Sequence, residues 1–217
     1  MGTDNLFWKR KNKSLKRKSR NRGKPPESFL IVCEGGKTEP NYFKAFKLSS
    51  ASIRVEGLGM NTLSLVKETL KIIERVEKDG IHYDQVWCVF DKDDFPAQNF
   101  NNAIELANKK NIKVAYSNEA FELWYLLHFH YYNSGVSRNQ YKVMLSKLLK
   151  FRYEKNDPTM YQKLLDKQST AISNAEKLLK TYHPANPGKD NPSTIVHHLV
   201  MELNKFLSTG YKKQCKS

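Results

Sequence analysis

The sequence predicts an α/β fold in which a mostly parallel four-stranded sheet is flanked by helices and followed by a helical C-terminal region. Four short apolar runs alternate with helical patterns between residues 28 and 116. Such alternation implies crossover connections and a parallel sheet covered on both faces. The 217 residues, 39% hydrophobic and 27% charged, have the composition of a globular protein, and the chain contains no internal repeat.

The elements of the sheet are expected in a regular order along the chain. The strands are expected at residues 28–33, 52–56, 85–90 and 112–116. The helices between them are expected at residues 39–46, 61–78 and 100–109. The second helix has the strongest pattern, because its apolar residues recur at three- and four-residue spacings. Asn61 is expected to cap this helix and Gly80 to stop it.

Three regions of different character are expected. Residues 1–26 form a disordered basic arm, residues 27–118 an α/β core, and residues 119–217 a helical region packed on or beside that core. Within the last region, helical patterns cover residues 118–130, 141–151, 161–182 and 192–206, with a loop at 183–192.

The N-terminal arm carries much of the chain's formal charge of +15. Residues 1–24 contain ten lysines and arginines but a single acid, Asp4, so this segment is expected to be disordered on its own. It is either a solvated tail or an arm that contacts phosphates, and we favour the arm because so dense a cluster of one sign repels itself without a polyanion. The residues expected to bind nucleic acid are Lys9, Arg10, Lys11, Lys13, Lys16, Arg17, Lys18, Arg20, Arg22 and Lys24.

Composition also argues against a membrane or secreted protein. No apolar run approaches the ~20 residues that a membrane-spanning helix needs, and the basic N-terminus lacks the apolar core of a secretory signal. The three cysteines are too few and too scattered for a disulfide framework or a zinc site. Cys33 and Cys88 lie in strand-like runs and are expected to be buried thiols. A cytoplasmic protein is the expectation.

The first candidate site is the segment IVCEGGKTEP at residues 31–40. Its Gly-Lys-Thr resembles the end of a phosphate-binding loop. Such a loop needs a glycine five positions before the second glycine, but Ile31 stands there, inside the strand. Glu34 would also repel an incoming phosphate. A nucleotide-binding loop is therefore not expected.

The second candidate site is the segment VFDKDDFP at residues 89–96, at the end of the third strand. In an extended chain Asp91 and Asp93 point to the same side, where two carboxylates need a proton or a cation. Oxygen ligands favour Mg²⁺ or Mn²⁺. Taken alone, Asp-Lys-Asp-Asp is typical of a solvated turn. If the first and third strands are neighbours, however, Glu34 faces the aspartates and the three acids form a metal site.

These motifs carry a resemblance to known families. A Glu-Gly after the first strand and an Asp-x-Asp after the third resemble the Toprim fold of topoisomerases, bacterial-type primases and several nucleases. The segments VCEGGKTEPNYF at 32–43, FDKDD at 90–94 and SNEAFELW at 117–124 more closely resemble the RloB family, over roughly residues 28–200. Members of that family are encoded near restriction and abortive-infection loci, often beside an ATPase of the ABC type.

The resemblance implies roles for individual acids. Glu34 is a metal ligand or general acid/base, and Asp91 and Asp93 are metal ligands, with Asp94 as a further ligand. Glu39 matches a second metal-binding acid of the overcoming-lysogenization-defect nucleases. Its spacing from Glu34 is one residue longer than in those nucleases, so Glu39 has a second interpretation, in which it favours the positive start of the following helix.

Four further residues accompany these acids. Glu119 and Glu122 lie one helical turn apart after the fourth strand, and they either complete a second metal site or take part in helix capping after Ser117 or Asn118. Lys37 and Lys92 are either ordinary surface lysines, which is the interpretation we favour, or residues that neutralise the scissile phosphate. The histidines are expected in the core or at the surface. Trp124, Tyr125 and Phe129 are expected in the core, with a base-stacking platform as the alternative.

The resemblance implies a Mg²⁺-dependent nuclease of the Toprim class that acts as an effector in abortive-infection phage defence. Its expected partners are nucleic acid and an ABC-type ATPase, with no membrane. The sequence leaves open whether RNA, such as tRNA, or DNA is cut, and it does not predict the oligomeric state. Two alternatives stay open: a non-catalytic module that binds nucleic acid or an ATPase, and a housekeeping nuclease that matures RNA.

Overall fold

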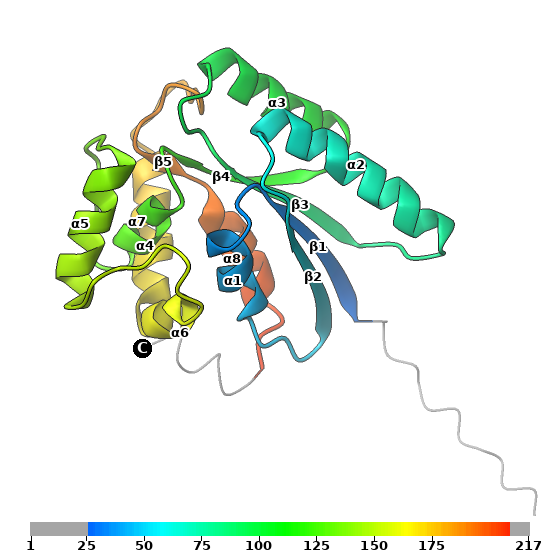
Figure 1. Cartoon of the computed structure of the whole chain (residues 1–217), viewed down its shortest axis with the longest axis horizontal. Coiled ribbons are helices and arrows are strands. Elements are labelled where there is room, and N and C mark those ends of the chain that lie inside the picture. The colour runs from blue at the N-terminus through cyan, green and yellow to red at the C-terminus, as the bar shows by residue number, and fades with distance from the viewer. Residues whose placement is uncertain (1–25, 209–217) are drawn as a thin grey trace, which may run out of the picture.

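The computed structural model describes residues 26–208. They form three layers, with a five-stranded sheet between two layers of helices (Figure 1). The strands lie in the order β2-β1-β3-β4-β5, and only the β4–β5 pair is antiparallel. They are β1 (Glu27–Cys33), β2 (Ala51–Gly57), β3 (Gln85–Asp91), β4 (Lys113–Asn118) and β5 (Ser193–Thr194). This confirms the predicted α/β class with a mostly parallel sheet flanked by helices, an arrangement consistent with a Toprim-like fold. The basic residues of segment 1–24 and Cys215 lie outside the described residues.

Strand β1 shows why helices cover both faces of the sheet. Its residues are apolar at successive positions, so both of its faces must be buried. Leu30 and Val32 belong to one hydrophobic cluster, whereas Phe29, Ile31 and Cys33 belong to another. All five side chains are fully buried. Because successive side chains of a strand point to opposite faces, β1 lies between two separate cores.

One face of the sheet is covered by α2 (Thr62–Lys78) and α3 (Ala97–Lys109). The expected ends of α2 are confirmed: the side chain of Asn61 accepts a hydrogen bond of 3.0 Å from the amide of Ser64, and Gly80 has a positive φ of 76°. Helix α3 begins at Ala97, three residues before the expected Phe100. The sequence pattern missed these residues because they lack the apolar periodicity of the rest of the helix.

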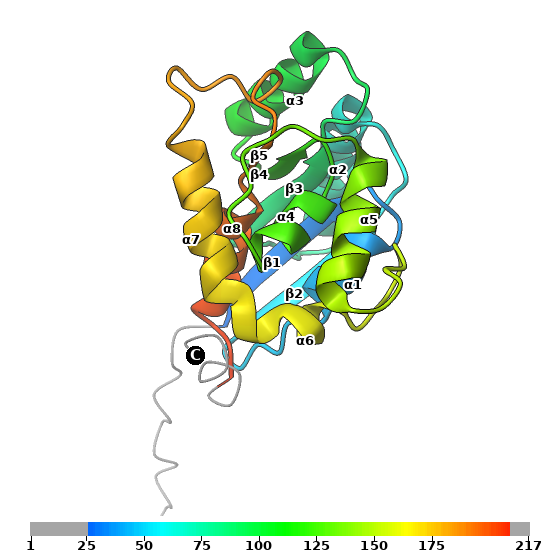
Figure 2. The same cartoon turned by 90° about the vertical axis from the view of Figure 1, so that its left-hand side faces the viewer.

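The other face is covered by α1 and by the helices that follow β4 (Figure 2). They are α1 (Thr38–Lys44), α4 (Glu122–Leu127), α5 (Arg138–Leu149), α6 (Met160–Leu164), α7 (Gln168–Leu179) and α8 (Val196–Asn204). Residues 119–208 therefore share one hydrophobic core with the sheet. The helix expected at 161–182 is divided by a 3₁₀ turn at Leu165–Lys167, and α4 is shorter than the expected 118–130.

The expected count of four strands is wrong. Residues Ser193 and Thr194 form a fifth strand, antiparallel to Ser117 and Asn118, and the helix expected from residue 192 begins only at Val196. A two-residue strand has no periodicity that a sequence pattern can detect. It is held by a buried hydrogen bond of 3.0 Å between the hydroxyls of Ser117 and Thr194.

The two cysteines of the sheet are free and buried, as predicted. Cys33 lies in the core shared with α1, and Cys88 lies on the opposite face, where its sulfur is 3.3 Å from the Thr69 hydroxyl. Among residues 26–208, no helix combines the length and apolar character that crossing a bilayer requires.

A pair of neighbouring substitutions tests whether both faces of the sheet are buried. Leu30→Ala and Ile31→Ala each remove a fully buried side chain from a different core, so each should lower the free energy of unfolding by about 2–5 kcal/mol. Ser52→Ala, at an exposed position of β2, is the control and should change it by less than about 0.5 kcal/mol. Urea unfolding monitored by circular dichroism measures all three. A cost below 1 kcal/mol for either core variant would contradict the two-sided arrangement.

Candidate metal centre

The candidate site lies where β1 and β3 end, at the carboxyl edge of the sheet. These two strands are parallel neighbours, with Cys33 opposite Val89. Glu34 is the residue after β1, and Asp91 is the last residue of β3. The two acids that the sequence places at separate strand ends are therefore on adjacent strands, which is the arrangement that functional sites of open α/β sheets use.

Glu34 is bonded directly to the end of β3. Its amide donates a hydrogen bond of 2.8 Å to the carbonyl of Val89, and its Oε2 accepts one of 3.1 Å from the amide of Asp91. Burial raises the pKa of Glu34 from 4.5 to about 8, against the lowering effect of the Asp91 amide. The negative charges of Asp93 and Glu39 raise this pKa further. Glu34 is thus held in place and takes up a proton readily.

Asp91 has an oxygen without a partner. Its Oδ1 is sealed from solvent and accepts no hydrogen bond from any group in residues 26–208. Burial raises the pKa of Asp91 well above its usual value, and the negative charges of Glu39, Glu122, Asp93 and Glu34 raise it further. A buried carboxylate oxygen without a donor costs free energy, so this position requires a proton or a cation.

Glu39, in the first turn of α1, packs against the turn formed by Glu34 and Gly35. Its side chain is only 5% exposed, and a Cβ placed on Gly35 would collide with its carboxylate. Burial raises the pKa of Glu39, whereas its own amide and Lys155 lower it. A larger residue at position 35 would therefore force the Glu39 side chain to shift. Glu39 both occupies the positive start of a helix and faces the acidic cluster, so its two interpretations are compatible.

Glu122, at the start of α4, is a second buried acid beside Glu39. It is 2% exposed, and the Tyr153 hydroxyl donates a hydrogen bond of 3.1 Å to its Oε1. Its charge raises the pKa of both Asp91 and Glu39. The alternative, in which Ser117 or Asn118 takes part in capping α4, is not seen. Both residues end β4, where Ser117 bonds to Thr194 and the Asn118 amide donates to the carbonyls of Pro187 and Asp190.

Asp93 and Glu119 are held by an arginine that the motifs do not include. The Arg138 guanidinium, from the first turn of α5, forms an ion pair with Asp93 Oδ1 and lies 3.8 Å from Glu119 Oε1. Asp93 does not continue the strand as expected: β3 ends at Asp91, and Asp93 has a positive φ of 47°. Strand alternation therefore does not determine which way the Asp93 side chain points. The negative charge of Asp93 still raises the pKa of Glu34.

The remaining predicted residues lie outside the buried cluster. Lys37 is exposed immediately before α1, and Asp94 is exposed in the turn after β3. Lys92 is half-buried, and its amine donates a hydrogen bond of 3.3 Å to the carbonyl of Asp93. The structure therefore brings together Glu34, Asp91, Glu39 and Glu122, places Asp93 and Glu119 beside them under Arg138, and leaves Lys37 and Asp94 at the surface.

The chemistry of this cluster fits a hard divalent cation. All of its side chains offer oxygen ligands, and the unpartnered Asp91 Oδ1 is the position where a cation would remove the cost of a buried charge. Among residues 26–208, no three His, Cys, Asp or Glu side chains have their ligand atoms already placed around one point. The described acids therefore do not form a ready-made set of cation ligands.

Comparison with known proteins gives one match. The family model described as "RloB-like protein" matches residues 29–203, which is most of the chain. The chain belongs to the RloB-like family. No curated protein and no solved structure matched. The acidic cluster of this RloB-like protein lies entirely within the matched residues, because its members extend from Glu34 to Glu122.

The histidines and aromatic residues of this RloB-like protein are placed as the sequence predicts. His128 is buried, its Nδ1 is 2.8 Å from the Trp124 carbonyl oxygen, and burial lowers its pKa to about 4. His197 is also buried, and burial lowers its pKa to about 3. Trp124 and Tyr125 are core residues. They contribute to packing and lie away from solvent.

Three residues of the site were not found from the sequence: Arg138, Tyr153 and Lys155. They come from α5 and the segment after it, far along the chain from the acidic motifs. The start of α5 did have a local signal, because Ser137 and Gln140 form a capping box. That signal places Arg138 at a helix start, but nothing in the sequence connects it with Asp93.

The contact between Gly35 and Glu39 predicts different costs at two adjacent glycines. Gly35→Ala forces a methyl group against the Glu39 carboxylate and should lower the free energy of unfolding by about 1–3 kcal/mol. Gly36→Ala is the matched control, because nothing lies within 4 Å of a Cβ there, and it should change stability by less than about 0.5 kcal/mol. In a Glu39→Ala background the cost of Gly35→Ala should largely disappear. Equal costs for both glycines would contradict this packing.

The buried carboxyls predict the pH dependence of stability without metal. The folded state raises the pKa of Glu34 from 4.5 to about 8, so its contribution to stability is fully present below about pH 4.5 and is lost as pH rises toward 8. His128 and His197 act in the opposite direction, because their pKa values are lowered. Comparison with Glu34→Gln therefore isolates the carboxyl. In the presence of a chelator, the melting temperature of the parent protein should fall relative to that of Glu34→Gln between pH 5 and pH 8.

The control for this measurement is Glu74→Gln, which removes an exposed carboxyl from α2. This variant should follow the parent protein at every pH. A melting-temperature difference between parent and Glu34→Gln that stays constant with pH would show that Glu34 is not held in a buried, proton-binding position.

Proposed function

We propose that this RloB-like protein is a nuclease that depends on Mg²⁺ or Mn²⁺ and hydrolyses phosphodiester bonds in nucleic acid. The observation that carries the proposal is the convergence of buried and half-buried acids from the end of β1, α1, β3 and α4, with an unpartnered oxygen on Asp91. Charged, desolvated carboxylates that repel one another destabilise a fold, so these acids need protons, a positive partner or a cation. Binding of a divalent cation would offset that cost.

The residues of the site have separable roles in this proposal. The bound cation would polarise the phosphodiester and stabilise the charge that develops on it. Asp91 and Glu39 would hold the cation, and Glu122 would support them under the Tyr153 hydroxyl. Glu34, whose pKa is raised by burial, would take up and return a proton beside the bound cation.

Arg138 gives the site a positive charge beside the acids. It is ion-paired with Asp93 and is about one-third exposed, so its guanidinium is accessible to a phosphate. Guanidinium groups bind phosphate oxygens in a bidentate manner. In the proposed reaction Arg138 would exchange Asp93 for a phosphate oxygen and position the substrate. This exchange would also free Asp93 to approach the cation.

The biological setting is proposed from the family resemblance. An effector of abortive infection in the cytoplasm, working beside an ABC-type ATPase, is the role that resemblance implies. The ten basic residues between 1 and 24 would contact phosphates without sequence preference and raise the affinity for nucleic acid.

A second candidate function is a non-catalytic module that binds nucleic acid. The ion pair between Arg138 and Asp93 favours it, together with the lack of a ready-made set of metal ligands among residues 26–208. In that case the acids would stay protonated or paired, and the basic segment alone would account for binding.

Asp91→Asn tests the proposed chemistry with little change of shape. The substitution removes the charge next to the unpartnered oxygen, so it should abolish saturable Mn²⁺ binding in calorimetry and lower metal-dependent cleavage by about 10²–10³-fold. Asp79→Asn, at the exposed end of α2, is the control and should leave both unchanged. Labelled RNA and DNA substrates are each incubated with parent and variants.

Several outcomes separate the two candidates. Cleavage by the parent but not by Asp91→Asn supports the nuclease. Equal cleavage by both proteins points to a contaminating enzyme and contradicts the assignment. Tight nucleic-acid binding by both, with neither Mn²⁺ binding nor cleavage by the parent, would support the binding module.

A further inference from the structure

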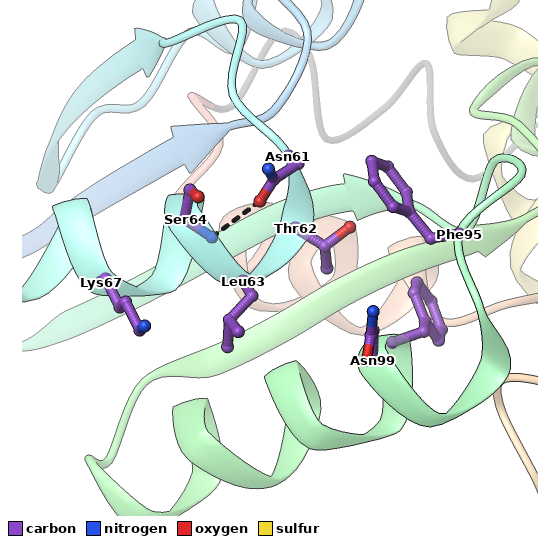
Figure 3. A pocket seen from close by; sticks show the side chains of 8 residues that line it. Asn61, Thr62, Leu63, Ser64, Lys67, Phe95 and Asn99 are labelled. Carbon is purple, nitrogen blue, oxygen red and sulfur yellow. Dashed lines mark hydrogen bonds between the residues drawn. The ribbon is translucent and has the colours of Figure 1, made fainter.

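A pocket of about 280 Å³ lies at the carboxyl edge of the sheet, between the starts of α2 and α3 (Figure 3). Asn61, which caps α2, lines it with Thr62 and Lys67 of that helix. Phe95, in the turn before α3, and Asn99, in the first turn of α3, line the other side. None of these residues belongs to the acidic cluster, so the pocket is a separate feature with its own chemistry.

The electrostatics of the pocket favour an anion. The first amides of a helix have no acceptor within the helix, and they carry the positive end of its dipole. Both helices are long, with 17 residues in α2 and 13 in α3, and neither has an acidic residue in its first turn. Asn61 satisfies the Ser64 amide, but α3 has no side-chain cap. Lys67 adds a full positive charge at the rim of the pocket.

Thr62 supplies an independent sign of a missing ligand. Its side chain is 3% exposed, and its hydroxyl has no hydrogen-bond partner among residues 26–208. Figure 3 shows the hydroxyl turned toward Phe95, across the pocket. A buried hydroxyl without a partner costs free energy, and an anionic oxygen in the pocket would accept its hydrogen bond.

The pocket adjoins the candidate metal centre through the backbone. The amide of Gly59, two residues before Asn61, donates a hydrogen bond of 2.8 Å to the carbonyl of Glu34. Phe95 lies four residues after Asp91, in the turn that leaves β3. The segment that follows β3 and the segment that follows β2, which is hydrogen-bonded to Glu34, thus both lead into the walls of the pocket.

We propose that this pocket binds a phosphate group of a nucleic-acid strand, next to the phosphodiester at the acidic cluster. The amides of the two helix starts, the Thr62 hydroxyl and the Lys67 amine would bind the phosphate oxygens. The half-buried ring of Phe95 would pack on the adjoining sugar or base. The choice of a nucleic-acid strand rests on the proposed function, whereas binding of phosphate by itself does not.

The test uses the full chain in the presence of a chelator, so that no cleavage is needed. Inorganic phosphate is titrated at millimolar concentrations, and backbone amide resonances are followed by nuclear magnetic resonance. The amides of Thr62, Leu63 and Asn99 should shift saturably. Thr62→Val and Lys67→Gln should each weaken phosphate binding roughly tenfold. Lys78→Gln, which removes the same charge at the far end of α2, is the control and should leave binding unchanged.

A second measurement assigns the source of the phosphate. Single-stranded oligonucleotide binding is measured against salt for the same variants, again with chelator. Lys67→Gln should reduce the slope of log affinity against log salt by about 1, and Lys78→Gln should not. Phosphate that shifts no pocket amide, or Lys67→Gln and Lys78→Gln that behave alike, would overturn the proposal. The proposal would also be overturned if phosphate bound in the pocket but Thr62→Val and Lys67→Gln left the affinity for the oligonucleotide unchanged. Loss of cleavage in Asp91→Asn with intact pocket binding concerns the proposed function alone.

Discussion

The structure depends on one electrostatic constraint: several carboxylates are held together at the carboxyl edge of the sheet, out of contact with most of the solvent. The two hydrophobic cores fix β1 beside β3, and this fixes Glu34 beside Asp91. Helices α1 and α4 bring Glu39 and Glu122 to the same place. Burial and mutual repulsion both disfavour the charged forms, so the cluster must hold protons, pair with Arg138 or bind a cation.

Much of the fold could be predicted because its elements have strong local signals. The apolar run of β1 and the periodicity of α2, with Asn61 at its start, predict elements that the structure confirms within a residue. Elements without such signals were missed. Strand β5 has only two residues, and it exists because Ser117 and Thr194 bond across the sheet. The pairing of distant segments, and not local propensity, decides such elements.

In the candidate site, too, some positions could be predicted from the sequence and others could not. The condition that the first and third strands are neighbours is met, so Glu34 and Asp91 lie at one edge of the sheet, although the sequence did not itself predict the strand order. Alternation did not predict Asp93, because the strand ends at Asp91 and the chain turns with a positive φ. Arg138 could not be found, since its link to Asp93 spans 45 residues and depends on how α5 packs. The exposed positions of Lys37 and Asp94 likewise follow from turns that the motifs do not encode.

The central claim is that the buried acids form a cation site, and anomalous diffraction from crystals soaked in Mn²⁺ tests it most directly. The account predicts a strong anomalous peak near Asp91 Oδ1, with oxygens of Glu34 or Glu39 at the ~2.0–2.3 Å typical of bound Mg²⁺ or Mn²⁺. It would be contradicted by crystals that show no peak at this edge under saturating Mn²⁺, with Arg138 still on Asp93 and the four acids unchanged.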